Sequence, residues 1–158
     1  MRRLVIALVV LLAVGACGVT IPTDPDGTLD RVRGGTLRVG VSPNSPWTDL
    51  PKGTDADPVG IEVELVQEFA ETLDAEIVWV PGGEEELITE LEHGYLDMVI
   101  GGLTARSPWS SKVALTYRYT VTTNVYGQEE QHVMAVPMGE NAFQAELERL
   151  LFDQDLPV

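Results

Sequence analysis

The stretch AEIVWVPGGEEELITELEHGYLDMVI, residues 75–100, carries the pattern that decides the fold. It begins with an apolar run that closes at Pro81-Gly82-Gly83, and it ends with a second apolar run from Leu96 to Ile100. Between them, Glu84 to Leu91 opens with three glutamates and carries apolar residues at helical spacing before His93-Gly94 ends it. A strand, a helix and a strand of these lengths predict a βαβ unit with parallel strands.

The residues before this unit show the same alternation. Thr36 to Val41 is a short β-type run, and the prolines beyond it predict a loop that continues to about Pro58. Apolar residues from Ile61 to Leu73 recur at steps of three and four, which predicts an amphipathic helix. The acidic residues assigned to its other faces are Glu62, Glu64, Glu68 and Glu71.

The residues after the unit predict further strands and one more helix. Residues 113–126 are strand-like, 127–130 have the composition of a turn, and 132–136 form another apolar run. A last helix is expected from Asn141, which forms the pattern of a capping box with Gln144. We therefore expect an α/β fold with a mostly parallel sheet and a terminal antiparallel hairpin.

The N-terminal residues have the features of a secretory signal. Two arginines precede an unbroken apolar run from Leu4 to Val14, which is too short to cross a membrane as a stop-transfer helix. Val14-Gly15-Ala16-Cys17 resembles the bacterial lipobox, in which the cysteine receives the lipid. We expect residues 1–16 to be a signal peptide and Cys17 to be a lipid anchor. The alternative is an ordinary signal peptide cleaved nearby, with Cys17 incidental.

Composition adds a tether and excludes several partners. Residues 18–34 are rich in Pro, Gly, Asp and Thr, so residues 17–34 are expected to be the anchored cysteine and a flexible tether, with the lobe at 35–158. Removing residues 1–16 removes two of the 10 basic residues and none of the 25 acidic ones, so the formal charge changes from −15 to −17. Such a surface repels nucleic acids and anionic headgroups, so attachment to the outer face of the membrane must come from the lipid.

Four motifs, in order, are similar to those of a known family. Gly35 to Val41 looks like its opening strand, Gly60 to Leu65 its G-[FIY]-[DE]-V-[DE]-L signature, and Leu91 to Met98 its L-x-x-G-x-x-D-x element. Gly102-Leu103-Thr104 fits the loop that follows. The chain thus resembles the extracytoplasmic solute-binding proteins of family 3, the polar amino-acid type that serves ABC importers. The resemblance implies a single three-layer lobe of the type II periplasmic-binding class and an extracytoplasmic location.

One departure from the family concerns its second lobe. In the family, that lobe is inserted between the strand near Tyr119 and the returning segment that His132 to Leu151 resembles. Here only twelve residues separate Tyr119 from His132, which is room for a hairpin and not for a domain. The chain therefore looks like the first lobe alone. An open lobe makes fewer contacts with a solute, so we expect low affinity.

A second departure concerns the ligand carboxylate. In the family's amino-acid binders, an arginine after the third strand holds this carboxylate as a bidentate pair. Alignment from either side places Trp109 or Ser110 at that position, and neither can make the pair. Arg106 lies three to four residues away. It either replaces the missing arginine or lies on the surface, paired with an acid for little energy.

The resemblance places the ligand at the carboxyl ends of the strands, as in other open α/β sheets. The ligand-binding candidates there are Asn44, Trp47, Gly102, Thr104 and Arg106. Trp47 stacks on the solute or caps the core, Gly102 admits backbone amides or makes a tight turn, and Thr104 bonds the solute or caps a turn.

No residues suggest catalysis, a metal or a cofactor. His93 and His132 lack ligand spacing, and there is no nucleophile elbow or phosphate loop. Our first hypothesis is a lipid-anchored binding protein for a small, polar, amino-acid-like solute that works with an ABC-type permease. The rival is a non-transporting interaction module that docks a membrane protein, or a second copy in a homodimer, and binds no solute.

Overall fold

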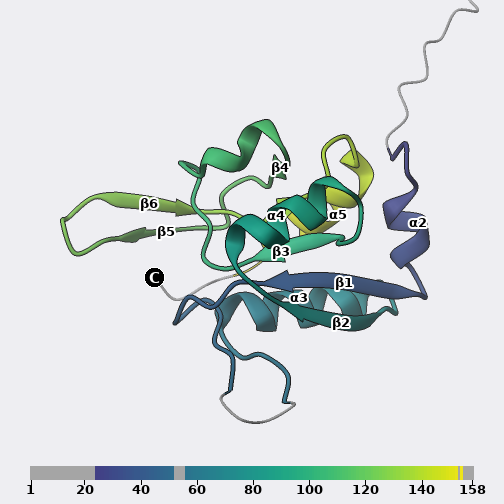
Figure 1. The fold of residues 1–158 in the computed structure, drawn as a ribbon, viewed down its shortest axis with the longest axis horizontal. Helices are drawn as coiled ribbons and strands as arrows, with labels where there is room; N and C mark the ends of the chain where they lie inside the picture. The colour runs from purple at the N-terminus through teal and green to yellow at the C-terminus, as the bar shows by residue number, and fades with distance from the viewer. Residues whose placement is uncertain (1–23, 52–55, 153, 155–158) are drawn as a thin grey trace, which may run out of the picture.

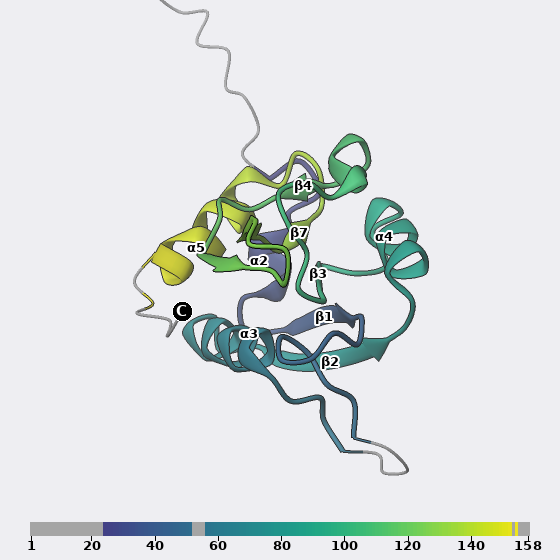
Figure 2. The same ribbon diagram turned by 90° about the vertical axis from the view of Figure 1, so that its left-hand side faces the viewer.

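A five-stranded sheet is the middle of three layers in the computed structural model of the chain, which describes residues 24–51, 56–152 and 154 (Figures 1 and 2). Its strands are β1 (Thr36–Val41), β2 (Glu76–Pro81), β3 (Met98–Ile100), β4 (Ala114–Leu115) and β7 (Ala135–Val136). The order is β2-β1-β3-β7-β4. β1 pairs in parallel with β2 and β3, whereas β7 pairs antiparallel with β3 and β4.

Helices cover both faces of the sheet because alternate strand residues point to opposite sides. The short helix α2 (Thr28–Val32) packs on one face with α3 (Ile61–Thr72) and α5 (Asn141–Phe152), in a core that includes Val39 and Met98. On the other face, α4 (Glu84–Glu92) and the 3-10 helix η2 (Pro108–Ser111) pack over Val99 and Ala135. Gly40 allows α4 and the loop after it to approach closely, since a Cβ there would lie 3.2 Å from Cδ2 of Leu87 in α4 and 2.8 Å from Cδ1 of Leu96.

The predicted α/β lobe and its hairpin are confirmed. The helices expected from residues 61, 84 and 141 begin at those residues, and the first three predicted strands correspond to β1, β2 and β3. The hairpin consists of β5 (Thr120–Thr123) and β6 (Glu129–His132), which pair antiparallel and project from the lobe (Figure 1). None of the helices within the described ranges is long and apolar enough to cross a membrane.

The predicted strand at 113–126 is wrong as a continuous element. It divides into β4 and β5 because the chain leaves the main sheet between them, where the Thr116 hydroxyl accepts a hydrogen bond from the Met134 backbone N–H (3.0 Å). The predicted turn at 127–130 is also displaced, since Glu129 and Glu130 pair with Thr123 and Thr122 inside the hairpin. The run at 132–136 divides in the same way, between β6 and β7.

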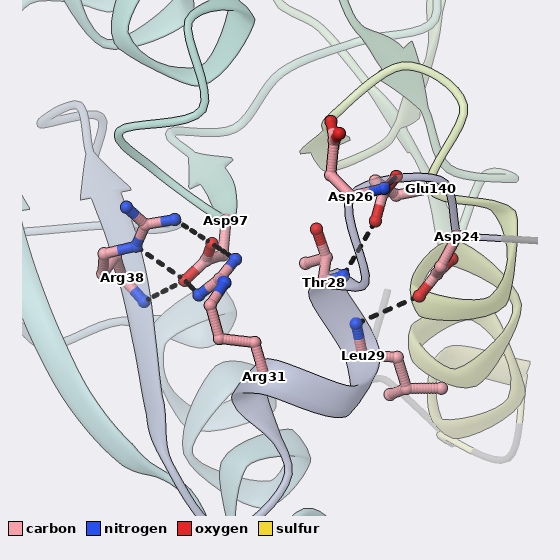
Figure 3. A network of polar contacts seen from close by, with 8 residues as sticks. All are labelled: Asp24, Asp26, Thr28, Leu29, Arg31, Arg38, Asp97 and Glu140. Atoms are coloured by element: carbon pink, nitrogen blue, oxygen red, sulfur yellow. Dashed lines mark hydrogen bonds and ion pairs between the residues drawn. The ribbon is translucent and has the colours of Figure 1, made fainter.

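The N-terminal boundary of the lobe lies earlier than expected. Residues 18–34 are predicted to be a tether, but from Asp24 onward they pack on the lobe, and Val32 is fully buried. The reason is a pair of carboxylates that join the two ends of the lobe (Figure 3). Asp24 accepts hydrogen bonds from the N–H groups of Ala142 and Phe143 in α5 (2.7 and 3.1 Å) and of Leu29 in α2 (3.0 Å).

Glu140, just before α5, makes the reciprocal connection to the N-terminal residues of the lobe. Its carboxylate accepts hydrogen bonds from the N–H groups of Asp26 (2.9 Å) and Thr28 (2.8 Å). The predicted capping box therefore does not form, because Asp24 takes the first-turn N–H groups of α5 and the Gln144 amide donates to the Leu115 carbonyl instead. The signal peptide, Cys17 and residues 18–23 lie outside the described residues.

Asp24→Ala should destabilise the lobe by about 1–2 kcal/mol, because it removes the acceptor for three N–H groups at two helix starts. Urea unfolding followed by circular dichroism measures the change. Asp26→Ala is the matched control, since the exposed Asp26 side chain accepts none of these bonds and its N–H, which donates to Glu140, is kept in the variant. Equal stability of the two variants would contradict a capping role for Asp24.

Candidate functional site

A buried carboxylate binds the loop that follows β3, at the carboxyl ends of the parallel strands. Glu62 is fully buried near the start of α3, where it accepts hydrogen bonds from the N–H groups of Gly101 (2.8 Å) and Gly102 (2.9 Å) and from the Tyr119 hydroxyl. Burial raises the pKa of Glu62, although these three hydrogen bonds oppose the shift by stabilising the charge. The sequence assigns Glu62 to a face of the helix away from its apolar residues, yet the side chain is buried, because the first turn of α3 faces the loop after β3.

Three of the predicted ligand-binding residues contact one another at this edge. The Asn44 amide donates to the Gly101 carbonyl (2.8 Å), and a Cβ on Gly102 would lie 2.4 Å from Cδ1 of Trp47. Gly102 has φ +64°, so it makes a tight turn that a side chain would obstruct. The Trp47 ring lies against His132, with the ring centroids 3.9 Å apart.

Two residues of this cluster, Tyr119 and His132, are not among the ligand-binding residues predicted from the sequence. Burial and the neighbouring Glu62 carboxylate raise the pKa of Tyr119, so its hydroxyl remains a donor. Burial lowers the pKa of His132, although the charge of Glu130 opposes this shift, and Nε2 of the ring lies 2.8 Å from the Thr122 hydroxyl. Their place at this edge can be recognised only once β5 and β6 are paired, because no local sequence pattern indicates that Tyr119 and His132 lie together.

Thr104 and Arg106 line a cavity of about 200 Å³ with residues of the hairpin. The Ala105 N–H donates to the Gln131 carbonyl (2.8 Å), and Thr104 forms an antiparallel bridge with His132. The loop after β3 therefore runs alongside β6 as if it were another strand. The full lining is Thr104, Ala105, Arg106, Glu129, Glu130 and Gln131.

Arg106 differs from the other cations of the described residues. Its exposed side chain makes no ion pair and no hydrogen bond there, so the predicted alternative of a surface pair with an acid is not found. Each other described basic side chain has a partner. Arg31 and Arg38 pair with Asp97, Arg33 and Arg149 with Glu146, and Lys112 with Glu92, while Arg118 lies over the Tyr117 ring.

The two alignment positions of the family's arginine lie elsewhere. The Trp109 indole N–H donates to Glu84 at the start of α4, and its ring packs on the smaller core. Ser110 is exposed in η2. Within the ranges that the structure describes, no group of three or more His, Cys, Asp or Glu side chains is placed to hold a metal.

The sequence and the fold match known proteins. The family model of the bacterial extracellular solute-binding proteins, family 3, matches residues 37–154, and the chain belongs to this family. It is 31% identical over 91 residues to a probable histidine-binding protein of Campylobacter jejuni subsp. jejuni serotype O:2. That match covers 58% of this chain and 35% of the relative, so the chain spans about a third of the relative's length.

The chain covers a larger share of the solved structures that it matches. The arginine-bound form of domain 1 from TmArgBP, the arginine-binding protein of T. maritima, is 25% identical with a TM-score of 0.68. The match covers 79% of this chain and 98% of that domain. The ancestral amino-acid-binding protein AncCDT-1, a precursor of cyclohexadienyl dehydratase, has a TM-score of 0.68 at 16% identity, with coverage of 79% and 92%, and shows the fold alone. The lobe therefore corresponds in extent to domain 1 of TmArgBP.

Proposed function

We propose that the chain is an extracytoplasmic binding protein for a small, polar, amino-acid-like solute, and that it works with an ABC-type membrane transporter. One observation carries the proposal: Arg106, which has no ion-pair or hydrogen-bond partner among the described residues, lines a cavity of about 200 Å³. A guanidinium matches a carboxylate with two parallel hydrogen bonds, so Arg106 is the anchor for the solute's carboxylate. The family and the amino-acid ligands named for the relatives support this choice.

The other predicted residues have distinct roles in this proposal. The Thr104 hydroxyl is a second polar contact in the cavity. Asn44, Trp47 and Gly102 support the loop from behind, since they contact one another and the Glu62-bound turn. A cavity on a single lobe leaves much of the solute exposed, so we propose a dissociation constant in the millimolar range, about −4 kcal/mol.

We also propose that residues 1–16 are removed and that Cys17 carries a lipid on the outer face of the membrane. The positive start, the apolar run and the lipobox pattern support this, together with membership of a family of extracellular proteins. The strongly acidic composition makes electrostatic attachment to anionic lipids unfavourable, so the lipid is the membrane contact.

Binding is tested by thermal unfolding of residues 17–158 carrying Cys17→Ser, with the twenty L-amino acids each at ten millimolar. At ten times its dissociation constant, a solute stabilises the fold by about 1.4 kcal/mol, a shift of several degrees for a domain of this size. Arg106→Ala should abolish the shift because it removes the carboxylate anchor. Arg118→Ala, which changes an exposed arginine outside the cavity, should retain it.

The rival function, an interaction module, is favoured by the tip of the hairpin. Val125 and Tyr126 are 94% and 84% exposed there, and large apolar side chains on a projecting tip are suited to contact with another protein. A flat solute panel from a cooperatively folded sample would overturn the first proposal. Concentration-dependent dimerisation in sedimentation velocity, lost in Val125→Ser/Tyr126→Ser, would then support docking of a second copy.

A further inference from the structure

β5 is the open edge of the projecting hairpin (Figure 1). Within the part of the chain that the structure describes, β5 pairs only with β6, whereas β6 is bridged on its far side by Thr104. We propose that β5 pairs antiparallel with β5 of a second copy of this chain, so that each hairpin tip covers an aromatic surface of the other copy. The cavity of Arg106 lies on the β6 side of the hairpin, so this interface goes beyond the proposed function and does not depend on it.

The backbone groups of β5 alternate between the two sides of the strand. Just beyond the strand, the Asn124 N–H donates to the Gln128 carbonyl (2.9 Å) on the β6 side. By alternation, the N–H of Thr122 points toward β6, whereas those of Val121 and Thr123 point outward. In an antiparallel ladder centred on Thr122, Val121 of one copy lies opposite Thr123 of the other. This register gives the outward N–H and carbonyl groups of both residues a partner in both copies.

The pairing edge lacks the charged side chains that usually keep edge strands apart. The chain has 25 acidic residues and a formal charge of −15, yet residues 119–126 contain no acidic and no basic residue. The central pair of the ladder joins two Thr122 side chains, and threonine pairs favourably across strands. The acids of the hairpin, Glu129 and Glu130, lie on β6. Two strongly acidic copies can therefore approach along this uncharged edge.

Large apolar side chains are exposed at both ends of β5, and the dimer brings the two ends together. At the tip, Val125 and Tyr126 are 94% and 84% exposed. At the base, the rings of Tyr117 and Phe152 lie 5.2 Å apart and are 52% and 64% exposed, beside a cavity of about 80 Å³. Tyr126 and Arg118 lie equally far from the centre of the ladder, so the tip of one copy reaches the base of the other. The surface is thus self-complementary, as a two-fold interface requires.

The Asn124 side chain fixes the conformation of the tip. Its Oδ1 accepts hydrogen bonds from the N–H groups of Tyr126 and Gln128 (both 3.0 Å), and its amide donates to Glu130 (3.0 Å). The turn that presents Val125 and Tyr126 is therefore formed before any contact with a second copy. Association then costs less conformational entropy than it would for an unstructured loop.

Sedimentation velocity of residues 17–158 carrying Cys17→Ser tests the dimer, from about 5 μM to about 500 μM, because small interfaces give weak association. We expect a sedimentation coefficient that rises with concentration, and stronger association in added salt, which screens the repulsion between acidic lobes. Tyr117→Ser/Phe152→Ser should weaken association about tenfold or more, because it removes the receiving surface. Tyr95→Ser is the matched control, since Tyr95 is 68% exposed near the start of β3, away from the hairpin.

A single cysteine tests the register. Residues that face one another in a non-hydrogen-bonded antiparallel pair have Cα atoms about 4.5 Å apart, a separation that a disulfide spans. Thr122→Cys, in the chain whose one native cysteine is replaced, should therefore form a covalent dimer on mild oxidation. Thr120→Cys is the control. Its counterpart is Asn124 of the second copy, so the two cysteines lie about 14 Å apart along the ladder and should remain unlinked.

The outcomes separate this interface from other contacts and from solute binding. A chain that stays monomeric over the whole concentration range would overturn the proposal, and equal cross-linking of the two cysteine variants would overturn the register. A dimer that Val125→Ser/Tyr126→Ser abolishes but Tyr117→Ser/Phe152→Ser leaves unchanged would overturn the receiving surface. Arg106→Ala should leave the dimer unchanged whether or not a solute binds, because Arg106 lies outside the interface.

Discussion

Asp97→Ala should lower the free energy of unfolding by about 3 kcal/mol, because it leaves two arginines without their shared counter-ion. The Asp97 side chain is fully buried at the start of β3, where one oxygen lies 2.6 Å from Nη2 of both Arg31 and Arg38 (Figure 3). The other oxygen accepts the backbone N–H of Arg38 at 2.8 Å. The arginines are partly exposed, so water recovers some of the loss, and the expected effect lies at the low end for a broken buried pair.

Urea unfolding followed by tryptophan fluorescence measures this change, and Glu76→Ala, an exposed acid at the same edge of the sheet, is its control.

The stabilisation by Asp97 also depends on pH. Burial opposes the charge of Asp97, but hydrogen bonds from Arg38 and Arg31 outweigh it and lower the pKa. The unfolded chain therefore binds the proton more readily, and the stabilisation present above about pH 4 is lost as the pH falls through the lowered pKa. If the free energies of unfolding of the wild type and Asp97→Ala still differed by the same amount in acid, this account would be wrong.

Glu62→Ala should destabilise the lobe by about 2–4 kcal/mol, because it leaves two backbone N–H groups and the Tyr119 hydroxyl without their acceptor and opens a cavity. Glu62→Gln keeps an acceptor of similar shape and should cost much less at neutral pH. Glu64→Ala, on the exposed side of the same helix turn, is the control. Equal losses for Glu62→Gln and Glu62→Ala would show that the acceptor role is not what stabilises this edge.

The same residue gives a pH dependence of opposite sign to that of Asp97. Burial raises the pKa of Glu62, so the folded lobe binds its proton more strongly than the unfolded chain does. Its contribution is greatest in acid and is lost as the pH rises from about 4.5 through the raised pKa. Glu62→Gln should remove this decline, and urea midpoints measured across the pH range test it. An unchanged slope in the variant would assign the decline to other groups.

The elements predicted well are those whose signal is local. The period of apolar residues from Ile61 to Leu73 and the glutamates before Leu87 are contained within one helix each, and both helices form where predicted. The motif order was also informative, because it predicted the lobe and the hairpin in place of a second domain. The strand-like run at 113–126 was misleading, since β-type composition does not show where a chain passes from one sheet to another.

The contacts that sequence patterns missed join distant residues. Periodicity placed Glu62 away from the apolar face and could not show that it is buried, because the N–H groups that it binds, in Gly101 and Gly102, lie about forty residues away. The composition of residues 18–34 predicted a tether. The carboxylates of Asp24 and Glu140 instead hold the segment that begins at Asp24 against the start of α5. Arg106 was identified as a candidate, yet its acidic neighbours in the cavity depend on the pairing of β6 with the loop after β3.

If Cys17 carries the proposed lipid, the early start of the lobe at Asp24 would limit how far the lobe can move from the membrane. With the lipid proposed on Cys17, only residues 18–23 connect the bilayer to the first residue held against α5. Even fully extended, this length of chain reaches about 25 Å. The hairpin projects from the end of the lobe opposite α2 (Figure 1), so it is the part most remote from the attachment point. Transfer of a solute to a permease in the same membrane would therefore require the long axis of the lobe to lie parallel to the membrane. With that axis perpendicular to the membrane, the hairpin and a solute beside it would be held away from the bilayer.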